Sequence, residues 1–198
     1  MIVTVASFKG GQAKTTTAIH LAALLNAHKP TLLVDGDPNR SATSWNRRKG
    51  FPFKVVDEKQ AVRFSREFEH IVIDTQARPT EEDLRELAAG CDVLIVPLTP
   101  DAMSLDTLFL LTDTLKKGNA EAKLKILLTI VPPKPSRDGE EVLATLAEAK
   151  LPTFKTVIRR YKAFQKAALE GVLVNEIDSP YAEEAWSDYV NVSKELLS

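Results

Sequence analysis

The fold of this chain is decided by one stretch, Ser7-Phe8-Lys9-Gly10-Gly11-Gln12-Ala13-Lys14-Thr15-Thr16-Thr17. Before it, residues 2–6 (Ile-Val-Thr-Val-Ala) form an apolar run that predicts a short buried strand. After it, residues 16–27 carry apolar side chains at helical spacing. A strand, a loop of small residues ending in Lys-Thr-Thr, and a helix together form the context that a phosphate-binding loop requires.

The chemistry of this loop suits a polyphosphate with Mg²⁺. Gly10 and Gly11 lack a Cβ, so the backbone can turn tightly and approach a polyphosphate. Successive N–H groups and the positive end of the helix dipole attract the anion. Lys14 is placed to neutralise the β- and γ-phosphates, and the Thr15 hydroxyl to ligate Mg²⁺. The residues expected to bind the nucleotide here are Lys9, Gly10, Gly11, Gln12, Ala13, Lys14, Thr15 and Thr16.

Two further segments end apolar runs in carboxylates. Residues 31–35 read Thr-Leu-Leu-Val-Asp and continue as Gly-Asp-Pro-Asn, so strand alternation puts Asp35 and Asp37 on one side. Beside a Mg²⁺–phosphate, they can hold metal-bound water and orient an attacking water. A plain turn explains residues 37–39 but does not explain Asp35. Asp74 follows the run Ile-Val-Ile and is expected to accept hydrogen bonds from Mg²⁺-bound water. Because these motifs agree, a strand-to-helix turn without a ligand is the weaker explanation of the first stretch.

With these motifs together, the chain resembles the ParA/MinD family of deviant Walker ATPases, which partition and position cellular cargo. The family's loop pattern is K-G-G-x-G-K-[ST]-[ST], and Lys9 stands at its signature lysine. Ala13 stands where the pattern has glycine. Its methyl group would lie close to the phosphates, where it can reduce nucleotide affinity or the rate of turnover. The resemblance implies that Asp37 is linked to hydrolysis and that Asp35 is its neighbour toward Mg²⁺.

The resemblance also implies a nucleotide-controlled dimer. In this family the signature lysine crosses a two-fold interface to the partner subunit's phosphates, so Lys9 joins Lys14 and Asp37 as the expected catalytic residues. ATP then helps to hold a sandwich homodimer together, and hydrolysis weakens it. The family places its base-binding region after a later strand, which assigns Thr129 and Pro132 to the adenine. An ordinary proline-rich loop is an equally good explanation of those two residues.

The most basic stretch is residues 158–166, Ile-Arg-Arg-Tyr-Lys-Ala-Phe-Gln-Lys. The resemblance implies that it binds DNA phosphates without reading sequence, which is typically weak and salt-dependent. The expected contacts are Arg159, Lys162 and Lys166, spaced to share one helix face, with Arg160 beside them. A solvated helix face with aromatics in the core is an equally weighted interpretation. Arg40 and residues 47–49 form a second basic candidate.

The resemblance also implies binding partners and a cellular location. A cargo-bound adaptor protein of ParB or McdB type is expected to stimulate hydrolysis, and the protein is expected to be cytoplasmic and nucleoid-associated. Plasmid, chromosome region and protein body all stay open as cargo. MinD-like relatives end in a basic amphipathic membrane helix, but residues 180–198 carry four carboxylates against one lysine, which opposes an anionic membrane. No membrane partner is therefore expected.

Strand and helix patterns alternate along all 198 residues. They predict one P-loop ATPase domain over residues 1–198, an α/β fold with a mostly parallel, twisted sheet, helices on both faces and the ligand at the carboxyl strand ends. The net charge of −1 confines any nucleic-acid surface to a local patch. Strands are expected at 1–7, 31–35, 53–56, 70–75, 92–98, 125–130 and 153–157, and helices at 14–27, 41–48, 59–68, 80–89, 104–117, 140–149, 161–170 and 180–197.

Two other functions remain open from the sequence. One is an ATP-dependent ligase with a fold like that of dethiobiotin synthetase, although no additional polar cluster for a second substrate is visible. The other is a scaffold that senses nucleotide and barely hydrolyses it, which Ala13 keeps open. An iron–sulfur reductase of similar fold is excluded, because Cys91 is the only cysteine.

Overall fold

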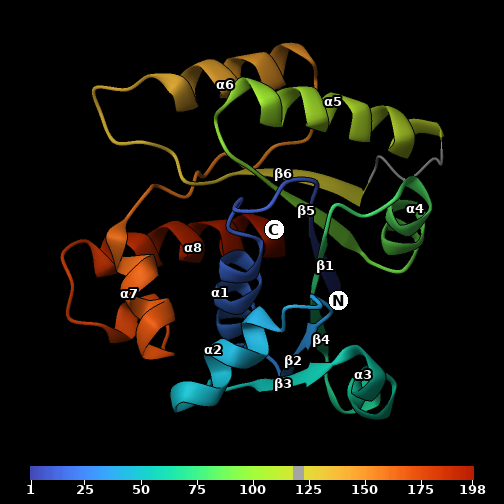
Figure 1. Ribbon diagram of the computed structural model, residues 1–198, viewed down its shortest axis with the longest axis vertical. Helices are drawn as coiled ribbons and strands as arrows, with labels where there is room; N and C mark the ends of the chain where they lie inside the picture. The colour runs from blue at the N-terminus through green and yellow to red at the C-terminus, as the bar shows by residue number, and fades with distance from the viewer. Residues whose placement is uncertain (118–122) are drawn as a thin grey trace.

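Six parallel strands form one sheet in the order β3-β2-β4-β1-β5-β6 in the computed structural model, which describes residues 1–117 and 123–198 (Figure 1). A helix connects each strand to the next along the chain, which is what a parallel arrangement requires. The predicted α/β fold with a mostly parallel sheet is confirmed. The strands are β1 (Ile2–Ser7), β2 (Thr31–Asp35), β3 (Lys54–Asp57), β4 (His70–Ala77), β5 (Val93–Leu98) and β6 (Leu124–Leu128).

Helices cover both faces of this sheet. The helices α1, α2, α7 and α8 share one buried cluster, whereas α3 to α6 pack on the other face. In Figure 1 the first group lies to the left of the strands, and α3 and α4 lie to the right. The helices are α1 (Lys14–Asn26), α2 (Ser41–Lys49), α3 (Glu58–Phe64), α4 (Glu81–Ala89), α5 (Ala102–Lys117), α6 (Asp138–Glu148), α7 (Lys162–Glu170) and α8 (Ala182–Leu197), with short 3₁₀ turns η1 (Ser65–Glu67) and η3 (Val174–Glu176).

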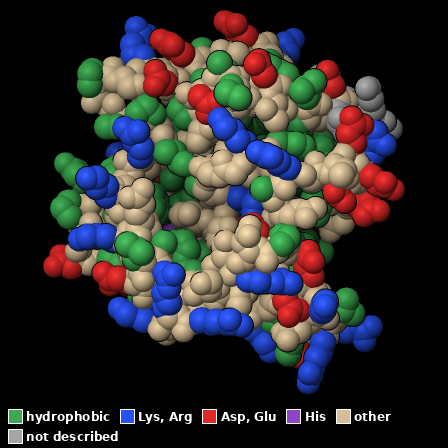
Figure 2. All heavy atoms as spheres, in the orientation of Figure 1, with side chains coloured by type: hydrophobic (Ala, Val, Ile, Leu, Met, Phe, Trp, Pro, Cys, Tyr) green, Lys and Arg blue, Asp and Glu red, His purple; other side chains and the backbone are tan. Residues whose placement is uncertain are grey.

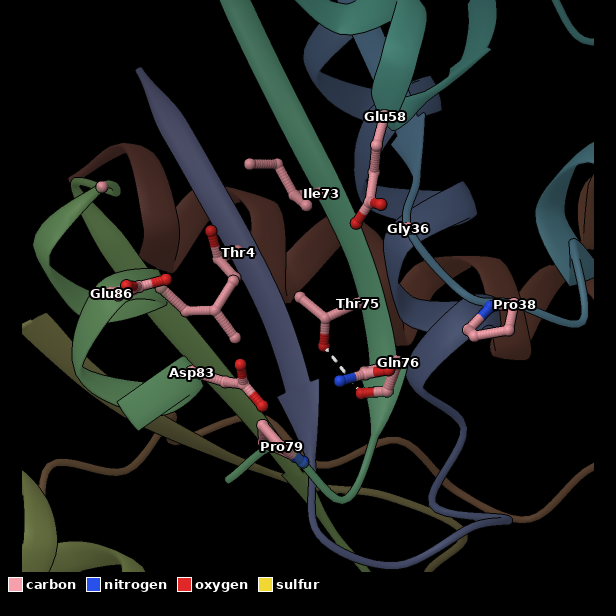
Figure 3. A pocket seen from close by; sticks show the side chains of 12 residues that line it. Thr4, Gly36, Pro38, Glu58, Ile73, Thr75, Gln76, Pro79, Asp83 and Glu86 are labelled. Atoms are coloured by element: carbon pink, nitrogen blue, oxygen red, sulfur yellow. Dashed lines mark hydrogen bonds between the residues drawn. The ribbon is translucent and has the colours of Figure 1, made fainter. Parts of the chain in front are cut away.

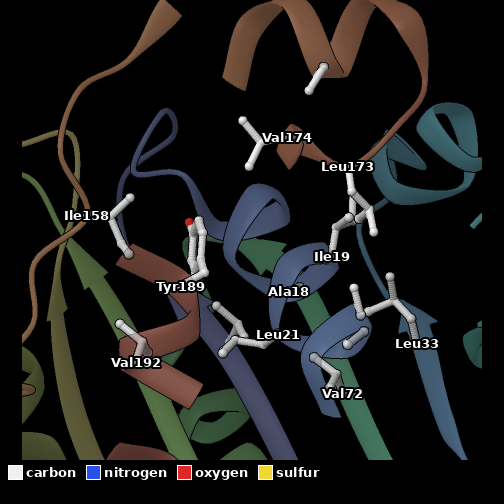
Figure 4. Close-up of a cluster of buried hydrophobic side chains, with 14 of the residues drawn as sticks. Ala18, Ile19, Leu21, Leu33, Val72, Ile158, Leu173, Val174, Tyr189 and Val192 are labelled. Atoms are coloured by element: carbon white, nitrogen blue, oxygen red, sulfur yellow. The ribbon is translucent and has the colours of Figure 1, made fainter. Parts of the chain in front are cut away.

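Helix α1 is apolar around most of its circumference because it lies between two layers. Leu21 and Ile19 are fully buried. Figure 4 shows Leu21 between Val72 of the sheet and the Tyr189 and Val192 side chains of α8, and Ile19 beside Leu173. Burying one such aliphatic side chain contributes about 1.5–3 kcal/mol. This packing fixes the position of α1, and therefore of the loop that precedes it.

The last helix packs on the domain, as its charge pattern predicted. Ala182, Ala185, Tyr189 and Val192 of α8 are all buried. None of the helices within residues 1–117 and 123–198 combines the length and the apolar character needed to cross a bilayer.

The predicted strand at 153–157 is wrong. That segment forms one isolated parallel bridge to β6, between Thr153 and Ile126. The N–H groups of Lys155 and Thr156 instead donate to the carboxylate of Glu195 on α8, at 2.8 Å each. A backbone N–H that is given to a side chain is lost to the sheet ladder, so the strand cannot continue.

His20 of α1 is fully buried with both ring nitrogens satisfied. Its Nδ1 lies 2.7 Å from the carbonyl oxygen of Thr16, and the N–H of Val174 donates to Nε2 at 3.2 Å. This arrangement requires the neutral ring, with its proton on Nδ1. The ring stacks on Tyr189, with 4.9 Å between centroids. The other rings around it belong to Trp45, Phe164 and Trp186.

Acid should destabilise the protein through His20. Burial lowers the pKa of His20 from 6.5 to about 4, although the Thr16 carbonyl opposes this change. The unfolded chain therefore takes up the proton first, and the contribution to stability is complete above pH 6.5 and lost as the pH falls toward 4. At about 1.4 kcal/mol per pH unit, the loss is roughly 3 kcal/mol. In urea unfolding from pH 7 to 4, His20→Gln should remove this slope. Equal slopes in both proteins would contradict the assignment.

Candidate nucleotide-binding site

The carboxyl ends of β1, β2 and β4 bring the three sequence motifs together. In the sheet register Asp35 pairs with Asp74, and Val5 of β1 also pairs with Asp74. The loop after β1 therefore begins beside both carboxylate-bearing strands. In a doubly wound sheet this is the edge where ligands bind.

The loop at residues 8–13 has the backbone of an anion-binding turn. Gly11 has φ +83°, and Ala13, immediately before α1, has φ 59° and ψ 26°. Left-handed residues leading into a helix N-terminus form a concave nest of N–H groups that suits a phosphate. A Cβ added at Gly10 or Gly11 would meet no atom within 4 Å, so open space lies beside both glycines.

Ala13→Gly should stabilise the protein. A left-handed backbone costs a residue with a Cβ about 1–2 kcal/mol. Glycine relieves this cost but loses more entropy on folding, so the net gain should be about 1 kcal/mol. Urea unfolding measures it. The matched control is Ala144→Gly at an exposed position inside α6, where the same change should cost about 1 kcal/mol. A loss of stability at Ala13 would show that the methyl group packs favourably.

Lys14 lies between two carboxylates of the site. Its Nζ donates to Asp74 Oδ1 at 2.8 Å and to Asp37 Oδ2 at 3.4 Å, and all three side chains are buried or nearly so. A buried ammonium between two carboxylates is held in a fixed position. Lys14, Asp37 and Asp74, which the sequence assigned to one site, therefore lie in direct contact.

Asp74 has the features of a carboxylate that faces a metal-bound water. Burial raises the pKa of Asp74, while Lys14 and the Thr15 hydroxyl oppose that rise. Its Oδ2 is buried and has no hydrogen-bond partner among the described residues. An orphaned buried acceptor next to a threonine hydroxyl fits the outer ligand shell of Mg²⁺. Thr15 and Asp74 are thus the residues that suit the cation.

Asp35 and Asp37 do different things locally. Asp35 is fully buried, and its Oδ2 accepts hydrogen bonds from the N–H and hydroxyl of Thr43 in the first turn of α2, at 2.8 and 2.7 Å. Its Oδ1 accepts the N–H of Asp37 at 3.3 Å. Asp35 therefore fixes the loop that carries Asp37, and its assignment toward Mg²⁺ stays a prediction. Asp37 Oδ1 accepts the backbone N–H of Asn39 at 2.8 Å, so the expected turn is present as well.

Lys9 points to a different partner from Lys14. Its Nζ lies 3.3 Å from Asp101 Oδ1, and its side chain is 40% exposed. Asp101 precedes α5 and accepts hydrogen bonds from Thr99 and Ser104. Although burial opposes the change, these hydrogen bonds lower the pKa of Asp101 to about 2. Asp101 is therefore a firmly ionised partner that holds Lys9 at the outer edge of the loop.

The prediction that Thr129 contacts the base needs correction. Thr129 is fully buried, and its hydroxyl donates to the carbonyl oxygen of Gln12 at 3.1 Å. The Gln12 side chain donates to the Ser104 hydroxyl at 3.0 Å. Because Thr129 has no solvent-exposed surface, it cannot contact a base and instead stabilises the loop through its hydrogen bond to Gln12. The Gln12 side chain in turn connects the loop to α5.

An apolar hollow of about 360 Å³ lies beside the phosphate-binding loop. The base of a nucleotide whose phosphates lie in the loop would be expected on this side. Pro132, which the sequence assigned to the base, does not line the hollow. Ile130 and Ile158, which line the hollow, were not predicted from the sequence, and the available signal was the apolar residue that ends the predicted strand at 125–130. Ile130 has φ 55°, a rare conformation for a β-branched residue and one that gathers at functional sites. Side chains on the hollow include Ala13, Thr16, Ile130, Ile158, Tyr161 and Phe164.

The basic stretch divides into one paired and three unpaired cations. Arg159 lies outside α7, so its predicted place on that helix face is wrong. Its side chain binds Asp188 of α8, with Nη2 2.7 Å from Oδ1. Arg160, Lys162 and Lys166 have no carboxylate partner within the described ranges. They line a groove of about 790 Å³ that adjoins the apolar hollow and shares Arg160 and Tyr161 with it. Figure 2 shows Lys and Arg side chains along the left edge of the molecule, over α7.

The loops that follow β2 and β4 border a hollow on one face of the sheet. The hollow, of about 420 Å³, lies on the sheet face between α3 and α4. Figure 3 shows Thr4 of β1 and Ile73 and Gln76 of β4 along it, with Pro38 on the loop after β2. Arg78 in the second loop has φ 58° and is exposed. Glu58 of α3 and Glu86 of α4 also line this hollow, so open space lies beside both loops.

The sequence and the fold have clear relatives. "Maintenance of carboxysome distribution protein A" of Gloeobacter kilaueensis is 34% identical over 204 residues, covering 98% of this chain and 93% of that protein. The ATP complex of Cyanothece McdA superposes with a TM-score of 0.77 at 18% identity, over 98% of this chain and 95% of the other. A plasmid partition protein of Borrelia burgdorferi B31 bound to AMPPNP gives 0.75 at 20% identity, over 98% of each chain.

The family assignment rests on most of the chain. The family model described as the CobQ/CobB/MinD/ParA nucleotide binding domain matches residues 3–174, which include the loop at 8–13 and the strands that end in Asp35 and Asp74. This confirms the resemblance found in the motifs. The chain belongs to the CobQ/CobB/MinD/ParA family of nucleotide-binding domains and, within it, is similar to the ParA and McdA positioning proteins.

Proposed function

We propose that this chain is a short ParA-type ATPase that binds ATP with Mg²⁺, forms an ATP-dependent sandwich homodimer, and positions or partitions a cargo. The observation that carries the proposal is the divergence of two lysines of one loop. Lys14 is buried against Asp74 and Asp37, whereas Lys9 is held at the loop's outer edge by Asp101. One lysine thus serves the phosphates of its own subunit, and the other is available to a partner's phosphates.

Each residue of the site has a place in hydrolysis. Bound Mg²⁺ would neutralise charge on the phosphates, with Thr15 and Asp74 holding it. Lys14, released from its carboxylates by the phosphates, would stabilise the charge that develops on them. Asp37 is only 8% exposed, faces the same space, and would orient the attacking water. Turnover is proposed to be slow until a partner protein stimulates it.

The proposed partners are nonspecific DNA and a cargo-bound adaptor of ParB or McdB type, in the cytoplasm and on the nucleoid. Support for DNA comes from the unpaired cations Arg160, Lys162 and Lys166, which lie together on one groove. Support for a protein body as cargo comes from the relative at 34% identity, which is named for carboxysome distribution.

Molar mass in solution should double with ATP·Mg²⁺ and stay that of a monomer with ADP·Mg²⁺ or without nucleotide. Lys9→Ala should remain a monomer in all three conditions yet bind ATP as the wild-type monomer does, because Lys9 pairs with Asp101 and not with the carboxylates of its own site. Light scattering after size exclusion gives the mass, and calorimetry gives the affinity. The matched control is Lys29→Ala, which removes an exposed lysine paired with Glu69. A wild-type monomer in every condition would rule out the dimer.

A second candidate function is a scaffold that senses nucleotide and barely hydrolyses it. The observation in its favour is Ala13, whose methyl group stands in the left-handed turn before α1. If it limits turnover, Ala13→Gly should raise steady-state ADP release while ATP affinity changes little. Equal, measurable turnover in both proteins would exclude this candidate.

A further inference from the structure

A stacked pair of tyrosines forms one wall of the groove beside α7. Tyr161 and Tyr181 stack with 5.7 Å between centroids and 16° between ring planes. The guanidinium of Arg159 lies over the Tyr161 ring, 5.2 Å from its centroid, and is itself fixed by Asp188. Tyr161 is therefore held from two directions, whereas Tyr181 is 62% exposed. An ordered aromatic ring with this much free surface is available to a further planar group.

The same groove carries four cations that have no ion-pair partner among the described residues, and only its Arg159 is paired, with Asp188. Lys134 enters it from the loop after β6, and Arg160, Lys162 and Lys166 come from the start of α7 and the segment before it. These four side chains have no ion pair within residues 1–117 and 123–198. None of the residues that line the groove is acidic. Aromatic surface and unpaired cations in one concave site are the two elements of a surface for single-stranded nucleic acid.

We propose that this groove binds a nucleic-acid strand with an unpaired base stacked on Tyr181 and its phosphates on Lys134, Arg160, Lys162 and Lys166. A duplex offers these cations its phosphates only, because its bases are already stacked on one another. A single strand offers phosphates and a free base face together. An acidic peptide would satisfy the cations but leave the tyrosine without a planar partner.

This inference rests on the nucleic-acid part of the proposed function and adds which form is preferred. The experiment uses the full chain with ATP·Mg²⁺ and fluorescence anisotropy with a labelled 20-nucleotide single strand and a duplex of the same length. Tyr181→Leu should weaken single-strand binding about 10-fold, as losing one stacked base does, and change duplex binding by less than about 2-fold. Tyr181→Phe is the matched control and should bind both as the wild type does. Lys162→Ala with Lys166→Ala should weaken both.

The outcomes distinguish failure of DNA binding as a whole from failure of the stacking site on Tyr181. A wild type that binds neither probe overturns the DNA proposal and this one with it. Binding that Tyr181→Leu leaves unchanged, or weakens equally for both probes, overturns the stacking site alone. Polyglutamate that competes as well as a single strand of equal charge also overturns it. The thermal melt of Tyr181→Leu must match that of Tyr181→Phe, so that a folding defect is not mistaken for a lost contact.

Discussion

Lys14→Ala should lower the affinity for ATP at least about 100-fold, as truncating one member of a buried, hydrogen-bonded charge pair does. Lys14 is the buried cation nearest to the position expected for the β- and γ-phosphates, and its Nζ lies 2.8 Å from Asp74. Without it, two carboxylates face the triphosphate and no lysine neutralises them. Isothermal calorimetry in Mg²⁺ measures the affinity.

Two controls make this result interpretable. Lys14→Ala leaves Asp74 buried without its cation, which costs about 3–5 kcal/mol where a buried pair is broken, so the fold of the variant must be checked by circular dichroism. Lys9→Ala removes a lysine from the same loop but should keep the ATP affinity of the wild-type monomer. Unchanged affinity in a folded Lys14→Ala variant would refute the phosphate-loop assignment.

Asp37→Ala should leave ATP binding intact and slow hydrolysis by about 100-fold or more, within the range expected for a positioned general base. The ATP-bound dimer should then persist, because its loss depends on hydrolysis. Single-turnover release of phosphate measures the rate, and the molar mass over time measures the lifetime of the dimer.

The turn at Asp37 needs its own control, because the carboxylate also accepts the N–H of Asn39. Asp37→Asn keeps an acceptor for that hydrogen bond and removes only the charge, so it should be as slow as Asp37→Ala. Asn39→Ala removes the 3.0 Å side-chain hydrogen bond to Asp37 but keeps the carboxylate, and should hydrolyse at nearly the wild-type rate. Normal turnover in Asp37→Asn would take the carboxylate out of the mechanism.

Local pattern was enough to identify most elements of the fold. The capping box predicted at Thr80 is present, with Asp83 N–H donating to the Thr80 hydroxyl at 3.1 Å and Thr80 N–H to Asp83 at 2.8 Å. These interactions join residues three apart, so the sequence contains them completely. The predicted strand at 153–157 failed because the N–H groups of Lys155 and Thr156 donate to Glu195, about 40 residues away, and no local pattern can report that competition.

The sequence by itself determined the phosphate loop, the carboxylates at the strand ends and the alternation of strands and helices. These depend on residue type and short spacing, and a parallel sheet brings its strand ends together whatever the details of packing. Tertiary structure alone decided that Thr129 supports the loop, that Asp188 neutralises Arg159, and that the two lysines diverge. Each of these depends on which distant residue lies within hydrogen-bond reach, and only the packed chain fixes that distance.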